Sequence, residues 1–150
     1  MKLLNDSLKD EIQEGYSQFL SSKGFTARYC QRLMIAEVAR QLSEAWDEDA
    51  ETYPLGLIEA PTGTGKTVAY VIGALPVAKR RGKRLVISTA TIALQEQLVF
   101  RDIPDIRANS DMDFSWALAK GRRRYVCLSR LDALLQVGVS GNQALAFFED

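Results

Sequence analysis

The chain of 150 residues contains no histidine, and this absence excludes several kinds of chemistry at once. A Ser-His-Asp triad, a histidine-bearing zinc site and acid–base catalysis by histidine are all ruled out for these residues. Two cysteines, Cys30 and Cys127, are too few for a disulfide framework. No run of about 18 apolar residues could span a bilayer, and charges occupy the N-terminus where a signal peptide needs its apolar segment. We therefore expect a cytoplasmic chain with no membrane partner, in which Cys30 is a buried structural thiol.

An excess of either charge is also lacking, because 19 Lys and Arg balance 19 Asp and Glu, but the distribution is uneven. Residues 1–60 hold six basic and eleven acidic residues, whereas residues 61–150 hold thirteen and eight. Two basic clusters stand out, at 79–84 and 120–124. The first falls where a helix should end, so we interpret it as a solvated helix terminus that complements the helix dipole. No helix end accounts for the second, which favours contact with phosphate or nucleic acid.

The most informative stretch present is LGLIEAPTGTGKT at 55–67, an apolar run that breaks into a glycine-rich turn. We interpret it as a phosphate-binding loop between a strand and a helix, because the backbone N–H groups near two glycines would converge on an anion. In such a loop the lysine reaches the β- and γ-phosphates and the following threonine ligates magnesium. The alternative is a chance loop before an amphipathic helix, which the order of strand, loop and helix disfavours. The predicted nucleotide-binding residues are Ala60, Pro61, Thr62, Gly63, Thr64, Gly65, Lys66 and Thr67, with Lys66 and Thr67 as the catalytic pair.

Hydrophobic periodicity predicts alternating elements along the rest of the chain. Helices are expected at 3–20, at 26–46 with Thr26 as N-cap, at 66–78 and at 92–100. Strands are expected at 55–58, 84–89 and 114–117. Strands that alternate with helices predict an α/β fold, in which a parallel sheet of P-loop NTPase type carries flanking helices and follows an N-terminal helical segment.

Four segments in this order resemble the superfamily 2 DNA helicases of the XPD/DinG group: RYCQRLM, IEAPTGTGKT, VISTATIALQEQL and KGRRRYVC. The resemblance covers residues 16–134 and implies a RecA-like motor domain. It implies an ATP-dependent DNA helicase of the bacterial cytosol, nucleoid-associated and active in DNA repair or replication, with ATP and magnesium as cofactors. Its partner would be single-stranded or forked DNA. The implied division is a helical segment with a Q motif (1–54), the first part of motor domain 1 (55–120) and the start of an iron–sulfur insertion (121–150).

The resemblance also assigns roles to individual residues. Gln31, with Arg28 beside it, matches the Q motif, whose glutamine reads the adenine edge; without the resemblance we would expect this glutamine to face solvent. Cys127 matches the first cysteine of a [4Fe-4S] cluster, which needs four thiolates and therefore a longer protein. The implied DNA contacts are Thr89, Thr91, Gln95, Lys120 and Arg122. For Thr91, capping of the following helix is an equally good explanation.

Two features that a helicase needs are missing from the sequence: an acidic Walker B segment and an arginine finger from a second motor domain. We therefore expect the N-terminal part of a longer helicase, inactive on its own. The alternative is a truncated, non-catalytic module that binds ATP or ADP weakly. A small P-loop kinase is a third possibility, which the segment VISTAT followed by LQEQL disfavours.

Overall fold

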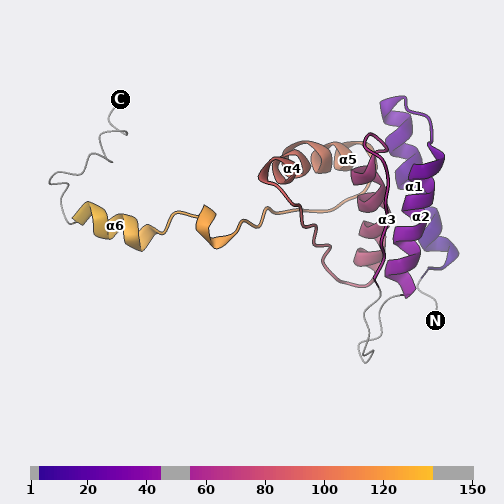
Figure 1. The fold of residues 1–150 in the computed structure, drawn as a ribbon. Helices are drawn as coiled ribbons and strands as arrows, with labels where there is room; N and C mark the ends of the chain where they lie inside the picture. The colour runs from indigo at the N-terminus through magenta and orange to yellow at the C-terminus, as the bar shows by residue number, and fades with distance from the viewer. Residues whose placement is uncertain (1–3, 45–54, 137–150) are drawn as a thin grey trace. The chain divides into compact units, whose positions relative to one another are not determined.

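The computed structural model describes residues 4–44 and 55–136, and every regular element in these ranges is helical (Figure 1). The chain divides into two units, Met1–Trp116 and Ala117–Asp150. None of the helices in the described ranges is long and apolar enough to cross a membrane. The elements are α1 (Asp6–Lys23), α2 (Tyr29–Glu44), α3 (Lys66–Arg80), α4 (Ile92–Gln97), a π-helical turn η1 (Leu98–Asp102), α5 (Ile103–Asn109), a 3-10 turn η2 (Arg122–Arg124) and α6 (Leu128–Gln136).

Helix α3 is the centre of the first unit, where it packs against α1, α2 and η1 (Figure 1). Most side chains of α3 are apolar, and those of Ala69, Ile72 and Val77 are at most 1% exposed. These side chains meet the apolar faces of α1 and α2, while Ile106 of α5 joins the same core. Burial of apolar surface between helices therefore holds this unit together.

The helix ends follow ordinary capping chemistry. At the start of α1 the side chain of Asn5 accepts a hydrogen bond from the Leu8 N–H at 3.0 Å, and Gly24 ends the helix in the left-handed conformation. Helix α2 begins at Tyr29, three residues beyond Thr26, so the prediction of Thr26 as its N-cap is wrong.

The basic cluster at 79–84 does mark a helix terminus, as predicted. Lys79 and Arg80 occupy the last turn of α3. Arg80 Nη2 donates to Glu11 Oε2 at 3.2 Å, and Arg81 Nη2 donates to the Ser43 carbonyl at 2.9 Å. The cluster therefore ties the end of α3 to α1 and α2, in addition to complementing the helix dipole.

A glycine sets how closely α2 and α3 approach each other. A Cβ atom at Gly73 would lie 2.8 Å from the carbonyl oxygen of Ile35 and 3.3 Å from its Cα. Both are backbone atoms of α2, which cannot rotate away. The two helices can pack this tightly only because position 73 carries no side chain.

The predicted parallel α/β sheet is wrong for the residues that the structure describes. The segments 55–58, 84–89 and 114–117 form no strand within the described ranges. Leu57 is 96% exposed and Val86 is 84% exposed, the reverse of the burial that a parallel strand needs. An apolar run indicates only the tendency of one segment, whereas a strand also requires a neighbouring backbone to pair with. The buried core of the described residues is formed by side chains of the helices instead.

The predicted helix at 92–100 extends further than expected, through η1 into α5. The N–H of Ile103 donates to the carbonyl of Leu98, five residues back, as a π turn requires. Pro104 follows immediately, and in a regular α-helix its ring would clash with the carbonyl of Phe100. The wider turn accommodates the proline without ending the helix.

Candidate nucleotide-binding site

The loop at 60–66 has the backbone shape that its glycines predict. Gly63 (φ 79°) and Gly65 (φ 76°) are both left-handed, a conformation that residues with a side chain rarely adopt. Gly65 is the N-cap of α3, which begins at Lys66 as expected. The loop therefore leads directly into a helix N-terminus, where N–H groups and the helix dipole favour an anion.

Lys66 lies against the loop that precedes it. Its Nζ donates to the carbonyls of Ala60 and Pro61, both at 2.9 Å, and the Thr64 hydroxyl also donates to the Pro61 carbonyl at 2.9 Å. These bonds fix the positive charge at the loop. An anion held by the loop would meet the ammonium group at close range.

Two residues of the predicted Q motif donate hydrogen bonds to the same loop. Arg28 Nη1 donates to the Gly63 carbonyl at 2.7 Å, and Gln31 Nε2 donates to the Gly65 carbonyl at 3.0 Å. Gln31 is only 8% exposed, so the expectation from its helical position alone, that it faces solvent, is wrong. The structure thus brings Arg28 and Gln31 together with the predicted phosphate loop, although they lie more than 30 residues away in sequence.

Thr67, the second residue of α3, has a tyrosine neighbour. Burial raises the pKa of the Tyr70 phenol, the hydrogen bond from Thr67 opposes this shift, and the charge of Asp102 adds to it. Tyr70 is therefore neutral near pH 7, and its hydroxyl can orient that of Thr67.

A cavity of about 910 Å³ opens beside the loop. This size is within the range of small-molecule sites, which typically combine apolar walls with a few polar groups. Its lining here includes three aromatic rings and both charged and amide groups. The lining residues that matter are Phe25, Arg28, Gln31, Gly65, Phe100 and Asp102.

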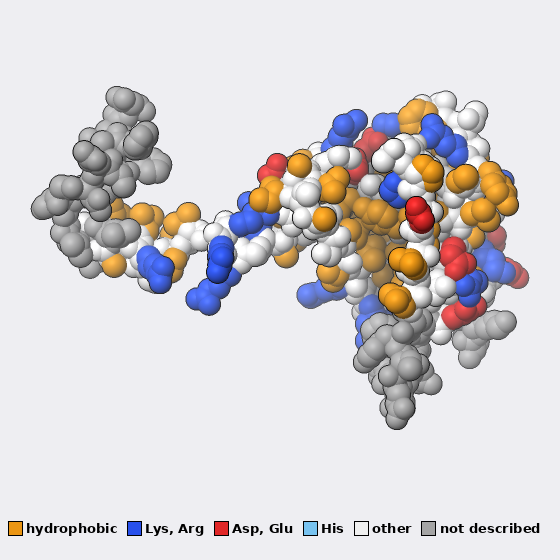
Figure 2. All heavy atoms as spheres, viewed as in Figure 1, with side chains coloured by type: hydrophobic (Ala, Val, Ile, Leu, Met, Phe, Trp, Pro, Cys, Tyr) orange, Lys and Arg blue, Asp and Glu red, His pale blue; other side chains and the backbone are white. Residues whose placement is uncertain are grey.

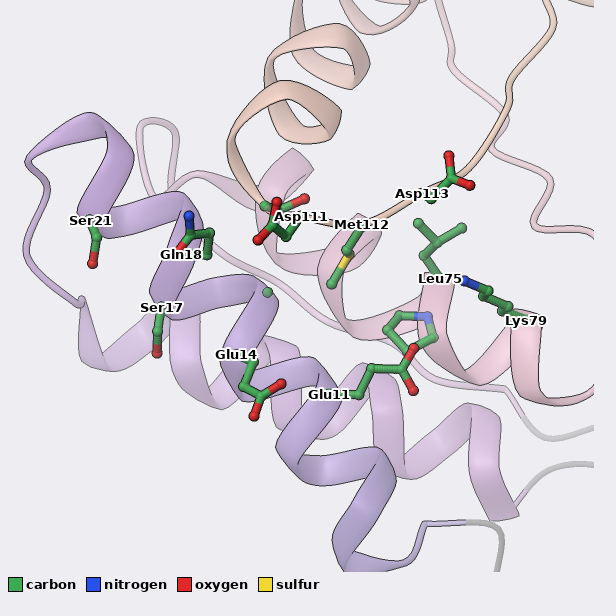
Figure 3. Close-up of a pocket in the computed structure, with 13 residues that line it drawn as sticks. Glu11, Glu14, Ser17, Gln18, Ser21, Leu75, Lys79, Asp111, Met112 and Asp113 are labelled. Carbon is green, nitrogen blue, oxygen red and sulfur yellow. The ribbon is translucent and has the colours of Figure 1, made fainter.

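A second cavity, of about 400 Å³, lies between α1, α3 and the segment after α5 (Figure 3). Figure 3 shows Glu11 and Glu14 on α1 facing Asp111, Met112 and Asp113, with Lys79 at one side. Part of this acidity is already compensated, since Glu11 pairs with Arg80 at 3.2 Å and Asp113 with Arg107 at 3.4 Å. None of the predicted site residues lines this cavity, so it is separate from the phosphate loop.

Thr91 lies at the N-terminus of α4. Its side chain accepts a hydrogen bond from the Leu94 N–H at 3.2 Å, so it caps α4 as the capping alternative predicts. The Thr89 hydroxyl donates to the Thr91 carbonyl at 3.2 Å and supports the same turn. Gln95 lies in α4 and is partly exposed.

The second unit carries the other predicted contacts. Lys120 and Arg122 are exposed, and the Lys120 N–H donates to the Tyr125 hydroxyl at 3.1 Å. Figure 2 shows blue side chains projecting from the turn that precedes α6. Cys127 is free and exposed. Cys30 is exposed as well, so the expectation that it is a buried structural thiol is wrong.

Metal binding by this chain is restricted by its donor set. Within the described ranges, no group of three or more His, Cys, Asp and Glu side chains could hold a metal ion. A cubane iron–sulfur cluster needs about four thiolates, and the sequence has only two cysteines. The chain by itself does not fit such a cluster. For magnesium, the Thr67 hydroxyl at a loop that fits phosphate is a suitable single ligand.

Sequence reasoning missed several residues around the site. Tyr16, on α1, donates a hydrogen bond to Gln31 Oε1 at 2.7 Å, yet in sequence it belongs to an apolar helical stripe. Phe25, Phe100 and Asp102 reach the cavity only because the loop after α1 and the η1 turn are brought beside Gly65. No local signal marks any of these residues, since their relevance depends on contacts between distant elements.

Comparison with known proteins agrees with the geometry of the loop. A sequence model of the DEAD/DEAH box helicases matches residues 30–137. The chain belongs to the DEAD/DEAH box helicase family. Within this family, the match begins next to Gln31 and includes the complete phosphate loop and the motif around Thr89.

Curated relatives of this helicase-family chain carry the name ATP-dependent DNA helicase DinG. The identity is 38% over 132 residues for the protein from Photobacterium profundum, covering 87% of this chain and 19% of the relative. It is 39% over 148 residues for Salmonella choleraesuis and 38% over 148 residues for Escherichia coli K12, each covering 98% of this chain and 20% of the relative. The predicted resemblance to the XPD/DinG group is thus confirmed. The chain spans about a fifth of the length of these relatives.

Proposed function

We propose that this chain forms the nucleotide-binding part of an ATP-dependent DNA helicase, which couples ATP hydrolysis to movement along single-stranded DNA and to duplex unwinding. The observation that carries the proposal is the loop at 60–66. The loop suits a nucleoside triphosphate for three reasons: it has two left-handed glycines, a lysine lies against it, and a helix begins directly after it. The names of the DinG relatives support the choice of ATP and DNA.

The residues of the loop have distinct roles in this proposal. Lys66 stabilises negative charge on the transferred phosphoryl group, and Thr67 ligates the magnesium ion that accompanies the nucleotide. When it is bound, magnesium neutralises part of the negative charge of the phosphates. Backbone N–H groups from Thr62 to Gly65 orient the phosphates, while Ala60 and Pro61 hold the lysine.

Base recognition falls to the Q-motif side of the cavity. Gln31 lines the cavity and presents an amide, which can donate to and accept from the adenine edge. Arg28 holds Gly63 and so keeps the loop beside that amide. Together these contacts would favour ATP over nucleotides with another base.

We propose single-stranded or forked DNA as the partner, with contacts from Thr89, Gln95, Lys120 and Arg122. The exposed cations of the second unit suit phosphate, which binds without regard to base sequence. Thr91 is a further proposed contact, because its oxygen accepts the capping hydrogen bond from Leu94 while its O–H can still donate to a phosphate. A role in DNA repair or replication, in a bacterial cytosol near the nucleoid, is consistent with this substrate.

Cys127 has a place in the proposal only as part of a longer protein. Its thiol is free and exposed, so it can serve as one thiolate ligand of an iron–sulfur cluster whose other ligands lie outside this chain. We derive no step of the reaction from that cluster.

The proposal is tested by replacing Lys66 with alanine in the full-length protein. Because Lys66→Ala removes the charge that stabilises the transferred phosphoryl group, DNA-stimulated ATP hydrolysis should fall by about 100-fold or more. The matched control is Lys9→Ala, since Lys9 forms an exposed ion pair with Asp6 on α1 and its loss should leave the rate unchanged.

Two outcomes would contradict the proposal. A Lys66→Ala variant that keeps a rate within a few-fold of wild type would remove the lysine from catalysis. A wild-type protein that binds ATP but hydrolyses none, with or without DNA, would instead favour the alternative of a non-catalytic nucleotide-binding module.

A further inference from the structure

A buried hydrogen-bond chain connects α1 to the phosphate loop through Gln31. The Tyr16 hydroxyl lies 2.7 Å from Gln31 Oε1, and Gln31 Nε2 lies 3.0 Å from the Gly65 carbonyl. Tyr16 is 6% exposed and Gln31 is 8% exposed. In such surroundings water competes poorly for these groups, so the bonds hold the amide firmly.

The chemistry of the three groups fixes which way the amide points. A backbone carbonyl can only accept, so the NH₂ end of Gln31 must face Gly65. The oxygen end then faces Tyr16, whose hydroxyl donates to it. The Gly65 carbonyl also accepts a hydrogen bond from the Ala69 N–H at 3.1 Å. Both lone pairs of this carbonyl oxygen are therefore used.

The Gln31 amide keeps unused hydrogen-bonding capacity, and Gln31 is one of the residues that line the cavity. After bonding Tyr16 and Gly65, Gln31 retains one N–H and one oxygen lone pair. One donor and one acceptor side by side match the N7 and N6 edge of adenine. Gln31 and Gly65 line the 910 Å³ cavity, whereas Tyr16 lies outside its lining among the described residues.

We propose that Tyr16 is a positioning residue for nucleotide selection, which fixes the amide orientation of Gln31 and couples α1 to the phosphate loop. This inference rests on the proposed function. Tyr16 touches no nucleotide itself. Its effect is exerted through Gln31, whose terminal torsion is broad and would otherwise allow the amide to turn.

The test replaces Tyr16 with phenylalanine in the full-length protein, which removes the hydroxyl and keeps the ring in the core. KM for ATP should rise about five- to tenfold, as expected for the loss of one buried hydrogen bond. At saturating ATP kcat should stay within about twofold, because Lys66 and Thr67 are unchanged. The preference for ATP over GTP should fall by a similar factor. Tyr29→Phe is the matched control, since Tyr29 is 73% exposed and its change should alter none of these values.

A double-mutant cycle separates positioning from a purely structural role. If Tyr16 acts through Gln31, the variant Tyr16→Phe combined with Gln31→Ala should have the same KM and ATP preference as Gln31→Ala alone. Effects that add fully would overturn the inference, as would an unchanged KM in Tyr16→Phe. An unchanged KM in Gln31→Ala, with hydrolysis still abolished by Lys66→Ala, would overturn this inference and leave the proposed function standing. Hydrolysis that survives Lys66→Ala would overturn the proposed function itself.

Discussion

Gly65 meets three requirements that no other residue type could meet together. Its φ of 76° is left-handed, it is the N-cap of α3, and a Cβ atom there would collide with Gln31 Nε2. The first requirement is common to tight turns, but the third is specific to this site. The hydrogen bond from Gln31 to the Gly65 carbonyl therefore depends on the absence of a side chain at position 65, whereas the bond from Arg28 to the Gly63 carbonyl does not.

We expect Gly65→Ala to lower both the stability of the fold and the affinity for ATP. Strain from the left-handed conformation should cost about 1–2 kcal/mol of the free energy of unfolding, and displacement of Gln31 should also weaken ATP binding. Gly82→Ala is the control, because Gly82 has a φ of 63° and an added Cβ would meet no described atom within 4 Å. Urea unfolding and ATP titration of both variants provide the check. Equal ATP affinity in the two variants would show that Gln31 does not depend on Gly65.

For individual residues, the sequence predicts the members of the phosphate loop but few of the side chains that contact the loop. Gly63, Gly65 and Lys66 follow from spacing alone, because only certain residues allow a loop to bind phosphate. The contact from Tyr16 to Gln31 joins residues on two helices, so it depends on how those helices pack. Thr91 illustrates the intermediate case, in which the sequence leaves two explanations and the structure shows the cap, while DNA contact stays a prediction.

The close packing of α2 on α3 is the feature that decides stability at the scale of elements. In isolation, changing a helical glycine to alanine favours the helix by about 1 kcal/mol. At Gly73 the added carbon would meet the backbone of Ile35 at 2.8 Å, so the helices would have to separate. At Gly15 it would meet only the terminal methyl of Met112, which can move.

These two glycines should respond to the same substitution in opposite ways. Gly73→Ala should lower the free energy of unfolding by about 1–3 kcal/mol, since overpacking outweighs helix propensity. Gly15→Ala should leave it unchanged or raise it by up to about 1 kcal/mol. Chemical denaturation of the two variants measures both values. A destabilised Gly15→Ala alongside an unaffected Gly73→Ala would contradict the packing described for α2 and α3.

Helices were predictable here and strands were not, for a physical reason. The apolar stripes of α1 and α3 repeat at helical spacing and are buried as that repeat requires. Residues 55–58 and 84–89 carry apolar side chains too, but pairing depends on a second segment that local sequence does not reveal. The π turn η1 was also missed, because it depends on where Pro104 falls within a longer helix.

For the molecule as a whole, the two basic clusters have different surroundings. The cluster at 79–84 is tied to α1 and α2 through Arg80 and Arg81. Lys120 and Arg122 are exposed in the second unit. Net charge alone cannot distinguish these cases, since both clusters belong to the basic part of the sequence.

Only substitutions in the second basic cluster, at 120–124, should weaken the binding of single-stranded DNA. Lys120→Ala or Arg122→Ala in the full-length protein should weaken binding about three- to tenfold, and the slope of log affinity against log salt concentration should become shallower by about 0.7 for each phosphate that is no longer bound. Lys79→Ala is the matched control, because this lysine lies beside the cavity of Figure 3 at the end of α3. Fluorescence anisotropy at several salt concentrations gives both quantities. A larger loss of affinity in Lys79→Ala would assign DNA binding to the other cluster.

The proposed function requires that ATP binds at the glycine-rich loop. Hydrogen exchange measured with and without ATP and magnesium tests this most directly. The segment 61–67 should exchange its backbone N–H groups more slowly when nucleotide is added, and Lys66→Ala should show none of that protection. Residues 6–12 at the start of α1 should exchange at the same rate in both conditions. Unchanged exchange at 61–67, with protection of another segment by the nucleotide, would contradict the assignment of this loop as the ATP site.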